Sequence, residues 1–167
     1  MEIWDLYDEN KNKVGKDWIR GEQIPDNYYH LVVHVWIKNK DGKYLISQRS
    51  ENRKMHPLMW ECVGGSVLKG ETSLEGAIRE VQEEVGINLS NHVGKIVFSQ
   101  VRKIWNGKKF NDIMDAWLFE YDGIVDLNNA TTDEVKQIKW LDKSEIKELF
   151  DQGKFVPTLS YFFEKIL

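Results

Sequence analysis

Three glutamates with helical spacing are the residues of this chain best suited to chemistry. Glu80, Glu83 and Glu84 stand at positions i, i+3 and i+4, so on a helix their carboxylates project to nearly the same side. Like charges at this spacing repel one another, and a divalent cation among them would turn the repulsion into coordination. Mg²⁺ takes oxygen ligands and commonly combines a few carboxylates with the phosphate oxygens of a substrate. The cluster is therefore either a solvated acidic face or a metal site.

The helix that would carry these carboxylates is predicted from Thr72 to Val85. Thr72 and Glu75 fit a capping box at its start, and Gly86 suits the position after its last turn. The apolar residues that follow the helical period are Leu74, Ala77, Ile78, Val81 and Val85. Because this apolar face must pack on a core, the glutamates are expected on the other side.

Glycines precede the helix where a ligand would need close access to the backbone. Gly64 and Gly65 follow an apolar stretch, and Gly70 ends a loop just before Glu71. A glycine lets the main chain approach a ligand and can present a carbonyl as a further oxygen ligand. The loop and the helix together thus favour the metal site over the solvated acidic face.

Gly65, Glu71 and the segment from Arg79 to Ile87 together resemble the Nudix box, G-x5-E-x7-R-E-U-x-E-E-x-G-U, in which U is a bulky aliphatic residue. All nine specified positions are filled at the required spacing between Gly65 and Ile87. The resemblance implies an α/β (α+β) fold, the Nudix-type α/β/α sandwich with a mixed sheet. It also implies hydrolysis of a pyrophosphate bond, by metal-activated water, in a nucleoside diphosphate-linked or related diphosphate substrate.

The resemblance also implies roles for individual residues. The metal ligands, for Mg²⁺ or Mn²⁺, would be oxygen atoms of Gly64, Glu80, Glu83 and Glu84. Glu83 is the expected general base, Arg79 would orient the glutamates by ion pairing, and Glu71 would support that network. For Arg79 and Glu71 an ordinary surface ion pair is the alternative.

Two aspartates beyond the box are further candidates. In this family the general base sometimes lies on a distal loop, and Asp112 and Asp115 stand in the segment NDIMDAWLFE. Each is a candidate distal base or metal ligand. Each is equally a strand-edge carboxylate without a chemical task.

The flanking sequence is similar to the branch of the family related to isopentenyl-diphosphate isomerase. That pattern has a catalytic cysteine and a metal-binding histidine on either side of the first box glycine, where this chain has Gly64 and Ser66. Cys62 lies two residues too early, about 7 Å along a strand, and is expected to be a core thiol. His30 stands where the isomerases have a metal-site histidine, but without its partner it is expected to be a hydrogen-bonded core or rim residue. Hydrolysis is thus favoured over the two alternatives, an isomerase-like enzyme and a catalytically silent binding or regulatory protein.

Strand patterns and turn residues predict the elements that position this site. Hairpins are expected at Asp8–Asn10, across His30–Ser50 and at Asn106-Gly107. A second helix should begin near Asp142 and stop by Gly153, and a short one should follow Pro157 and include Leu167.

Basic residues near these hairpins have two interpretations. The hairpin at Asn106-Gly107 carries Arg102, Lys103, Lys108 and Lys109. Arg49 follows the strand of the preceding hairpin. Solvated charge is the expectation for all of them, and contact with a substrate phosphate is the alternative.

Composition bounds the class of protein. The 167 residues are 41% hydrophobic and 30% charged, with a formal net charge of −4 and Cys62 as the single cysteine. The acidic balance disfavours nucleic acid as a partner, and no apolar run is long enough to span a membrane. We expect one cytoplasmic domain over residues 1–167, with residues 1–28 as an N-terminal hairpin extension and a small-molecule diphosphate as its partner. A homodimer stays open, because many proteins of this fold dimerise.

Overall fold

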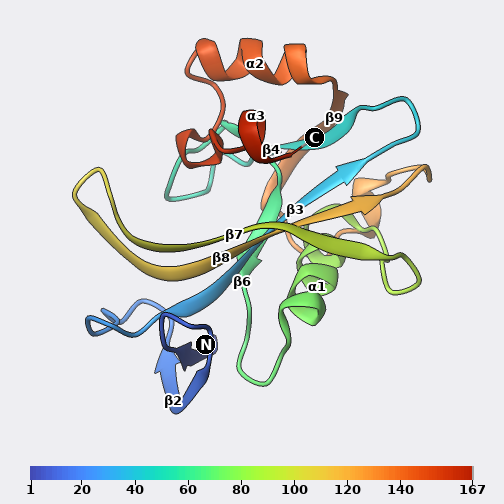
Figure 1. Ribbon diagram of the computed structural model, residues 1–167. Coiled ribbons are helices and arrows are strands. Elements are labelled where there is room, and N and C mark those ends of the chain that lie inside the picture. Colours follow the sequence, from blue (N-terminus) through green and yellow to red (C-terminus); the bar gives the residue numbers. More distant parts are fainter. Residues whose placement is uncertain (167) are drawn as a thin grey trace.

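The computed structural model describes residues 1–166, which form two β-sheets with helices on both faces of the larger one (Figure 1). The strands are β1 (Ile3–Tyr7), β2 (Lys13–Ile19), β3 (His30–Lys38), β4 (Tyr44–Arg49), β5 (Trp60–Glu61), β6 (Val63–Ser66), β7 (Gly94–Trp105), β8 (Lys108–Glu120) and β9 (Val135–Leu141). The helices are α1 (Ser73–Val85), α2 (Lys143–Asp151) and α3 (Phe162–Lys165), with 3-10 turns at Leu127–Asn129 and Pro157–Leu159. None of these helices is long and apolar enough to cross a membrane.

The N-terminal hairpin forms the smaller sheet. β1 and β2 pair antiparallel, with Trp4 opposite Trp18, as the turn residues between them predicted. Tyr7 and Tyr29 exchange two backbone hydrogen bonds of 2.8 and 2.9 Å, which attach this hairpin to the start of β3. The hairpin therefore stands beside the larger sheet rather than within it.

The larger sheet is mixed, as predicted. Its strand order is β5-β4-β3-β8-β7, with β6 also paired to β3 and β9 also paired to β4. β3 runs parallel to β8 and antiparallel to β6. The predicted hairpin at Asn106-Gly107 is confirmed, since β7 and β8 pair antiparallel up to Trp105 and Lys108.

The prediction of a hairpin across His30–Ser50 is correct at the turn and wrong for the strand pairing beyond it. β3 and β4 pair only at Lys38 and Tyr44 and then diverge. β6 takes the place of β4 along β3, and β5 pairs with β4 on the same side. β9 pairs along the other edge of β4. The short segment 60–66 thus bridges the split between the two strands, and it carries the glycine pair of the box.

Helices cover both faces of this sheet, which confirms the α/β/α arrangement. Leu31, Val33, Val35 and Ile37 of β3 belong to the core under α1. Trp36 belongs to the opposite core, together with Ile146 of α2 and Phe162 of α3. In Figure 1 α1 lies below the plane of β7 and β8, and α2 and α3 lie above it. β3 therefore contributes alternate side chains to two separate cores.

The helix signals are confirmed in detail. Thr72 caps α1 in a capping box with Glu75, and Gly86 ends the helix in the left-handed conformation with φ 72°. Asp142 caps α2 in the same way with Glu145. On the predicted apolar face of α1, Leu74 is 39% exposed because it lies in the first turn, beyond the edge of the core. The predicted helix after Pro157 is split into a 3-10 turn and α3, and its member Leu167 lies outside the described residues.

Candidate active site

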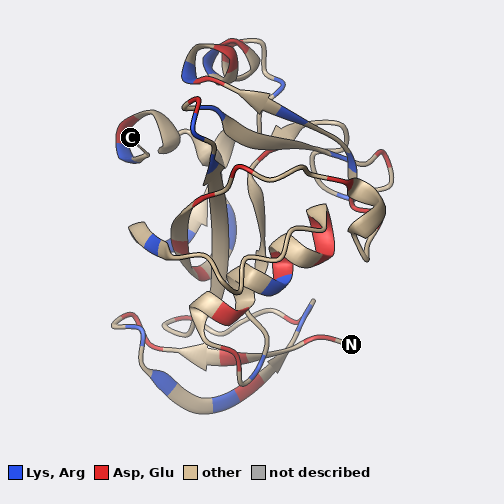
Figure 2. Ribbon diagram, turned by 90° about the vertical axis from the view of Figure 1, so that its right-hand side faces the viewer, with Lys and Arg blue, Asp and Glu red and all other residues tan. Residues whose placement is uncertain are grey.

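The box glutamates and the glycine pair lie against each other, because β6 packs beside α1. Gly64 and Gly65 are in β6, directly opposite His34 and Val33 of β3. A Cβ atom at Gly65 would lie 2.3 Å from the carboxyl carbon of Glu80. Any larger residue at this position would displace the Glu80 carboxylate, so glycine serves here for space rather than for backbone freedom. Figure 2 shows the charged residues that cluster on this helix.

Arg79 organises the carboxylates around it. Its Nε and Nη2 donate to the two oxygens of Glu71 at 2.7 and 3.1 Å. Its Nη1 donates to Glu80 at 2.9 Å and to Glu83 at 3.1 Å, and Nη2 also donates to the carbonyl of Ser66 at 2.8 Å. Glu71 in turn accepts from the backbone N–H of Leu68 at 2.9 Å. This network of one cation and several partly buried carboxylates joins the loop, the helix and β6. It is therefore more than the isolated surface ion pair that was the alternative.

Burial raises the pKa of two of the glutamates, Glu80 and Glu84. Desolvation raises the pKa of Glu80 to about 7, although the charge of Arg79 opposes the change. Desolvation also raises the pKa of Glu84 well above its usual range, and the nearby carboxylates Glu61 and Glu80 add to the effect. Oε2 of Glu84 is buried and has no hydrogen-bond partner among the described residues. A buried acceptor without a donor is unusual in a folded protein and marks a place for a cation or a proton.

The predicted metal ligands do not form a finished ligand set. Within residues 1–166, no three histidine, cysteine or acidic side chains are placed to hold a metal ion together. Arg79 instead holds Glu80 and Glu83. The donor set nevertheless fits a hard divalent cation, because carboxylate oxygens are its preferred ligands and Glu84 offers an unpaired one.

Two cavities meet at the glycine pair. The smaller, of about 90 Å³, is mainly acidic: two arginines, Arg20 and Arg53, line it together with the glutamates Glu2, Glu80, Glu83, Glu84 and Glu134. The larger, of about 370 Å³, lies on the opposite face of β3 and is lined by four cationic side chains, those of Arg49, Arg53, Arg102 and Lys109. Gly64, Gly65 and Arg53 line both cavities. A molecule that passes this point would have one end among carboxylates and the other among cations.

Two arginines of the larger cavity are held by buried carboxylates, which overturns the expectation of solvated charge for them. Arg102 forms two hydrogen bonds with Asp112, of 2.7 and 2.8 Å, and its side chain is 14% exposed. Arg49 donates to Glu61 at 2.7 Å. The two-pronged pair fixes the guanidinium plane of Arg102, and Arg49 is held by Glu61 together with the carbonyl of Met55. Both arginines keep other N–H groups that can bind an anion.

The structure separates the two aspartates proposed as distal bases. Asp112 lines the larger cavity, where burial raises its pKa despite the opposing charge of Arg102. Asp115 is fully buried on the other face of β8 and lines neither cavity. It accepts hydrogen bonds from Lys11 at 2.5 Å, Ser73 at 2.6 Å and Ser99 at 2.7 Å. The structure therefore does not bring Asp115 to the glutamates, and its contacts tie the N-terminal hairpin to the start of α1.

Glu134 is a site residue that the sequence analysis missed. The backbone N–H groups of Thr131 and Thr132 both donate to the carbonyl of Glu83, at 2.9 and 3.2 Å, so this segment is fastened to the end of α1. Gly86 allows the close approach, because a Cβ there would lie 2.7 Å from Asn129. Glu134 follows in the chain, lines the smaller cavity and pairs with Arg53 at 2.5 Å. No local pattern marks Glu134, since only the folded contact brings it to the box.

Cys62 and His30 lie in the larger cavity wall. Cys62 is 3% exposed, and burial raises the pKa of its thiol well above the usual value, as expected of a core thiol. His30 stacks on Trp4 with ring centroids 4.0 Å apart, and desolvation lowers its pKa to about 4. Cys62 therefore does not have the environment of a reactive thiol. His30 is a core residue as predicted, but it is not hydrogen-bonded through Nδ1, which is buried without a partner among the described residues.

Comparison with known proteins agrees with this geometry. The NUDIX domain family matches residues 28–159. An uncharacterized Nudix hydrolase of Listeria monocytogenes is 38% identical over 98% of this chain and 91% of its own length. An isopentenyl-diphosphate Delta-isomerase of Salmonella heidelberg is 28% identical over 72% of this chain and 65% of its own length.

A solved structure shares the fold over the whole length. The crystal structure of a Deinococcus radiodurans protein superposes with a TM-score of 0.77, at 20% identity, over 99% of this chain and 100% of that chain. The fold, the complete box and the match over most of the chain agree with one another. The chain therefore belongs to the Nudix hydrolase family.

Proposed function

We propose that this protein hydrolyses a pyrophosphate bond in a nucleoside diphosphate-linked or related small diphosphate, with Mg²⁺ or Mn²⁺ as its cofactor. The observation that carries the proposal is the junction of an acidic and a cationic cavity at Gly64 and Gly65. A diphosphate placed across this junction has one phosphate near the carboxylates and the rest of the molecule near the arginines.

The metal would be held by Glu80, Glu83 and Glu84, with the Gly64 carbonyl as a further ligand. A divalent cation bound there supplies positive charge to phosphate oxygens and makes water more acidic. The unpaired oxygen of Glu84 and the cavity that Glu80, Glu83 and Glu84 line support this assignment. Arg79 uses one oxygen of each of Glu80 and Glu83, which leaves the other oxygen of each carboxylate for the cation.

The chain supplies the other parts of the reaction. The side chain of Glu83 is 37% exposed, compared with 12% for Glu80, so Glu83 is the carboxylate that water reaches. As general base it takes the proton of the attacking water, while a phosphorus–oxygen bond of the pyrophosphate breaks. Arg79 and Glu71 act as positioning residues, because they fix the carboxylates from one side. In the larger cavity Arg49, held by Glu61, is oriented to bind the substrate's anionic charge.

A panel assay tests this proposal. Purified protein is incubated with nucleoside diphosphate derivatives, nucleoside triphosphates and isopentenyl diphosphate, with Mg²⁺, with Mn²⁺ and with EDTA. We expect metal-dependent cleavage of at least one compound and a loss of about 100-fold or more in Glu84→Gln, which removes a charged ligand. Glu148→Gln, on the exposed side of α2, is the matched control and should retain full activity.

Other outcomes would overturn the proposal. Double-bond isomerisation of isopentenyl diphosphate without phosphate release would favour the isomerase-like alternative. Metal binding without cleavage of any compound would favour a binding or regulatory protein. Cleavage that survives both EDTA and Glu84→Gln would place the chemistry elsewhere in the molecule.

A further inference from the structure

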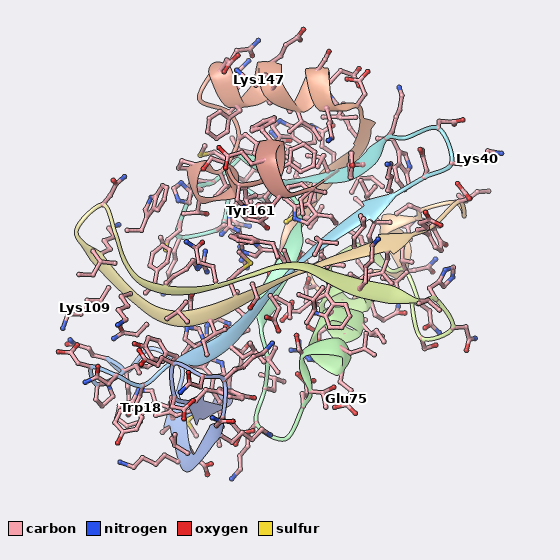
Figure 3. The ribbon with its side chains drawn as sticks, in the orientation of Figure 1. Trp18, Lys40, Glu75, Lys109, Lys147 and Tyr161 are labelled. Carbon is pink, nitrogen blue, oxygen red and sulfur yellow. The ribbon has the colours of Figure 1, made fainter. Side chains whose placement is uncertain are left out.

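A hydrogen-bonded trio lies beneath the larger cavity and has no part in the reaction described above. Tyr161 comes from the C-terminal segment and lies between α3 and the sheet, where Figure 3 labels it. Its hydroxyl is 3.0 Å from Nε1 of Trp36 and 2.8 Å from Nδ1 of His34. The rings of His34 and Tyr161 are also nearly parallel, with centroids 5.8 Å apart. Two neighbouring side chains of β3 thus fix the hydroxyl group of a residue more than 120 positions later in the chain.

The donors and acceptors of these three side chains determine where their protons lie. The indole N–H of Trp36 is a donor only, so the Tyr161 oxygen accepts from it. The described residues offer the Tyr161 hydroxyl one acceptor, Nδ1 of His34. All groups are satisfied when Tyr161 donates to Nδ1, which leaves the imidazole proton on Nε2.

The opposite edge of the imidazole faces the cavity. His34 lines the larger cavity, and its Cδ2, which is bonded to Nε2, lies 3.3 Å from the position of a Cβ atom at Gly64. Nε2 has no hydrogen-bond partner among residues 1–166 and is not one of the fully buried polar atoms without a partner. The Nε2–H group is therefore a free donor beside the junction of the two cavities.

The hydrogen bond from Tyr161 also settles the charge of the ring. With Nδ1 as an acceptor, the imidazole is neutral and donates from Nε2–H without adding a cation to a cavity that already has four.

We propose that His34 is a substrate-binding residue that donates from Nε2–H to a phosphate oxygen of the diphosphate lying across Gly64. Tyr161 is the positioning residue that holds His34 in this tautomer. The inference rests on the proposed function, because it takes the substrate to be a diphosphate. It extends that function by adding an uncharged contact at the point where the two cavities meet.

Nitrogen-15 NMR of the histidine side chains tests the tautomer without any turnover. In the wild-type protein at pH 7 His34 should show a protonated Nε2 and an unprotonated Nδ1. Tyr161→Phe should shift His34 toward a mixture of tautomers. Tyr44→Phe is the matched control, since the Tyr44 hydroxyl lies in the same core and has no hydrogen-bond partner among the described residues. A wild-type His34 protonated on Nδ1 would overturn the proposal.

Binding of methylenediphosphonate, a diphosphate that cannot be hydrolysed, tests the contact itself. In the presence of Mg²⁺ this probe should shift the Nε2–H resonance of His34. His34→Phe should weaken its binding about tenfold or more, as expected for a lost hydrogen bond to a charged group. His34→Gln keeps an N–H donor and should recover part of the affinity.

The two proposals fail in different ways. Suppose that cleavage depends on Glu84, but that a folded His34→Phe variant has unchanged probe affinity and KM. The role of His34 would then be wrong, and the proposed hydrolase activity would be unaffected. Absence of cleavage, combined with probe binding that depends on His34, would overturn the hydrolase and leave the diphosphate contact standing.

Discussion

Glu80→Gln should gain stability relative to the wild-type protein as the pH rises, provided that no metal is present. Burial raises the pKa of Glu80 from 4.5 to about 7, so the folded protein keeps a proton that the unfolded chain has released. The stability that this proton contributes is fully present below pH 4.5 and is lost as the pH rises through 7. Glutamine cannot titrate, so the variant is spared this loss.

The size of the effect follows from the two pKa values. A carboxyl pKa of 4.5 in the unfolded chain and about 7 in the folded protein corresponds to about 3 kcal/mol, of which about 2.5 kcal/mol falls between pH 5 and pH 8. The Glu80 side chain is 12% exposed, so solvent screening reduces this figure little. Burial lowers the pKa of His30 to about 4 and of His34 to about 3, which makes both proteins more stable as the pH rises through 6.5. That opposite contribution is common to both proteins and cancels in their difference.

Urea unfolding in EDTA, followed by tryptophan fluorescence at pH 5, 6.5 and 8, measures this difference. Glu148→Gln, an exposed glutamate on α2, should show no such trend. Addition of Mg²⁺ at pH 8 should stabilise the wild-type protein more than Glu80→Gln, because a ligand that binds only the folded state adds stability. A difference between wild type and Glu80→Gln that is equal at pH 5 and pH 8 would refute the reasoning.

Two further substitutions follow from the packing. Gly65→Ala places a Cβ atom 2.3 Å from the Glu80 carboxyl carbon, which moves the carboxylate by about 1 Å and should lower turnover about 100-fold. The circular dichroism spectrum should be unchanged, and Ser66→Ala, at the next residue, is the control. Normal turnover in Gly65→Ala would contradict the assignment. Asp115→Ala removes the hydrogen-bond acceptor of Lys11 and leaves a charge-assisted network unpaired. The free energy of unfolding in urea should therefore fall by about 3 kcal/mol. Unchanged stability with lost turnover would instead indicate that Asp115 acts in the chemistry.

Local features of the structure were predictable because their signals lie within a few residues. The caps at Thr72 and Asp142 were marked by a glutamate three positions later, and the β7–β8 turn by Asn106-Gly107. The grouping of the box carboxylates followed from helical spacing alone. In each case the interaction partners are neighbours in the chain, so their identity and spacing determine the outcome.

Features that depend on distant contacts were not predictable. The split between β3 and β4 arises because β6 pairs along β3 and β5 pairs along β4, while β9, some 90 residues later in the chain, pairs with the other edge of β4. Glu134 reaches the box only because its segment is fastened to the carbonyl of Glu83. Asp112 and Asp115 are three positions apart, which places them on opposite faces of a strand, so that spacing already argues against a shared role. The fold then decides which of the two faces a cavity.

The alternation of side chains along β3 has a consequence for how such an enzyme can diversify. The box glutamates lie on the α1 side of the sheet, and the residues that would select a substrate, such as His30 and Val32, lie on the other side. Among the described residues, the two cavities share a pair of glycines and one arginine. Under the proposed function, substitutions in the larger cavity would therefore change which molecule is accepted without disturbing Arg79 and its partners. Selectivity and reactivity would then belong to opposite faces of the sheet, and each could evolve, or be engineered, while the other is held constant.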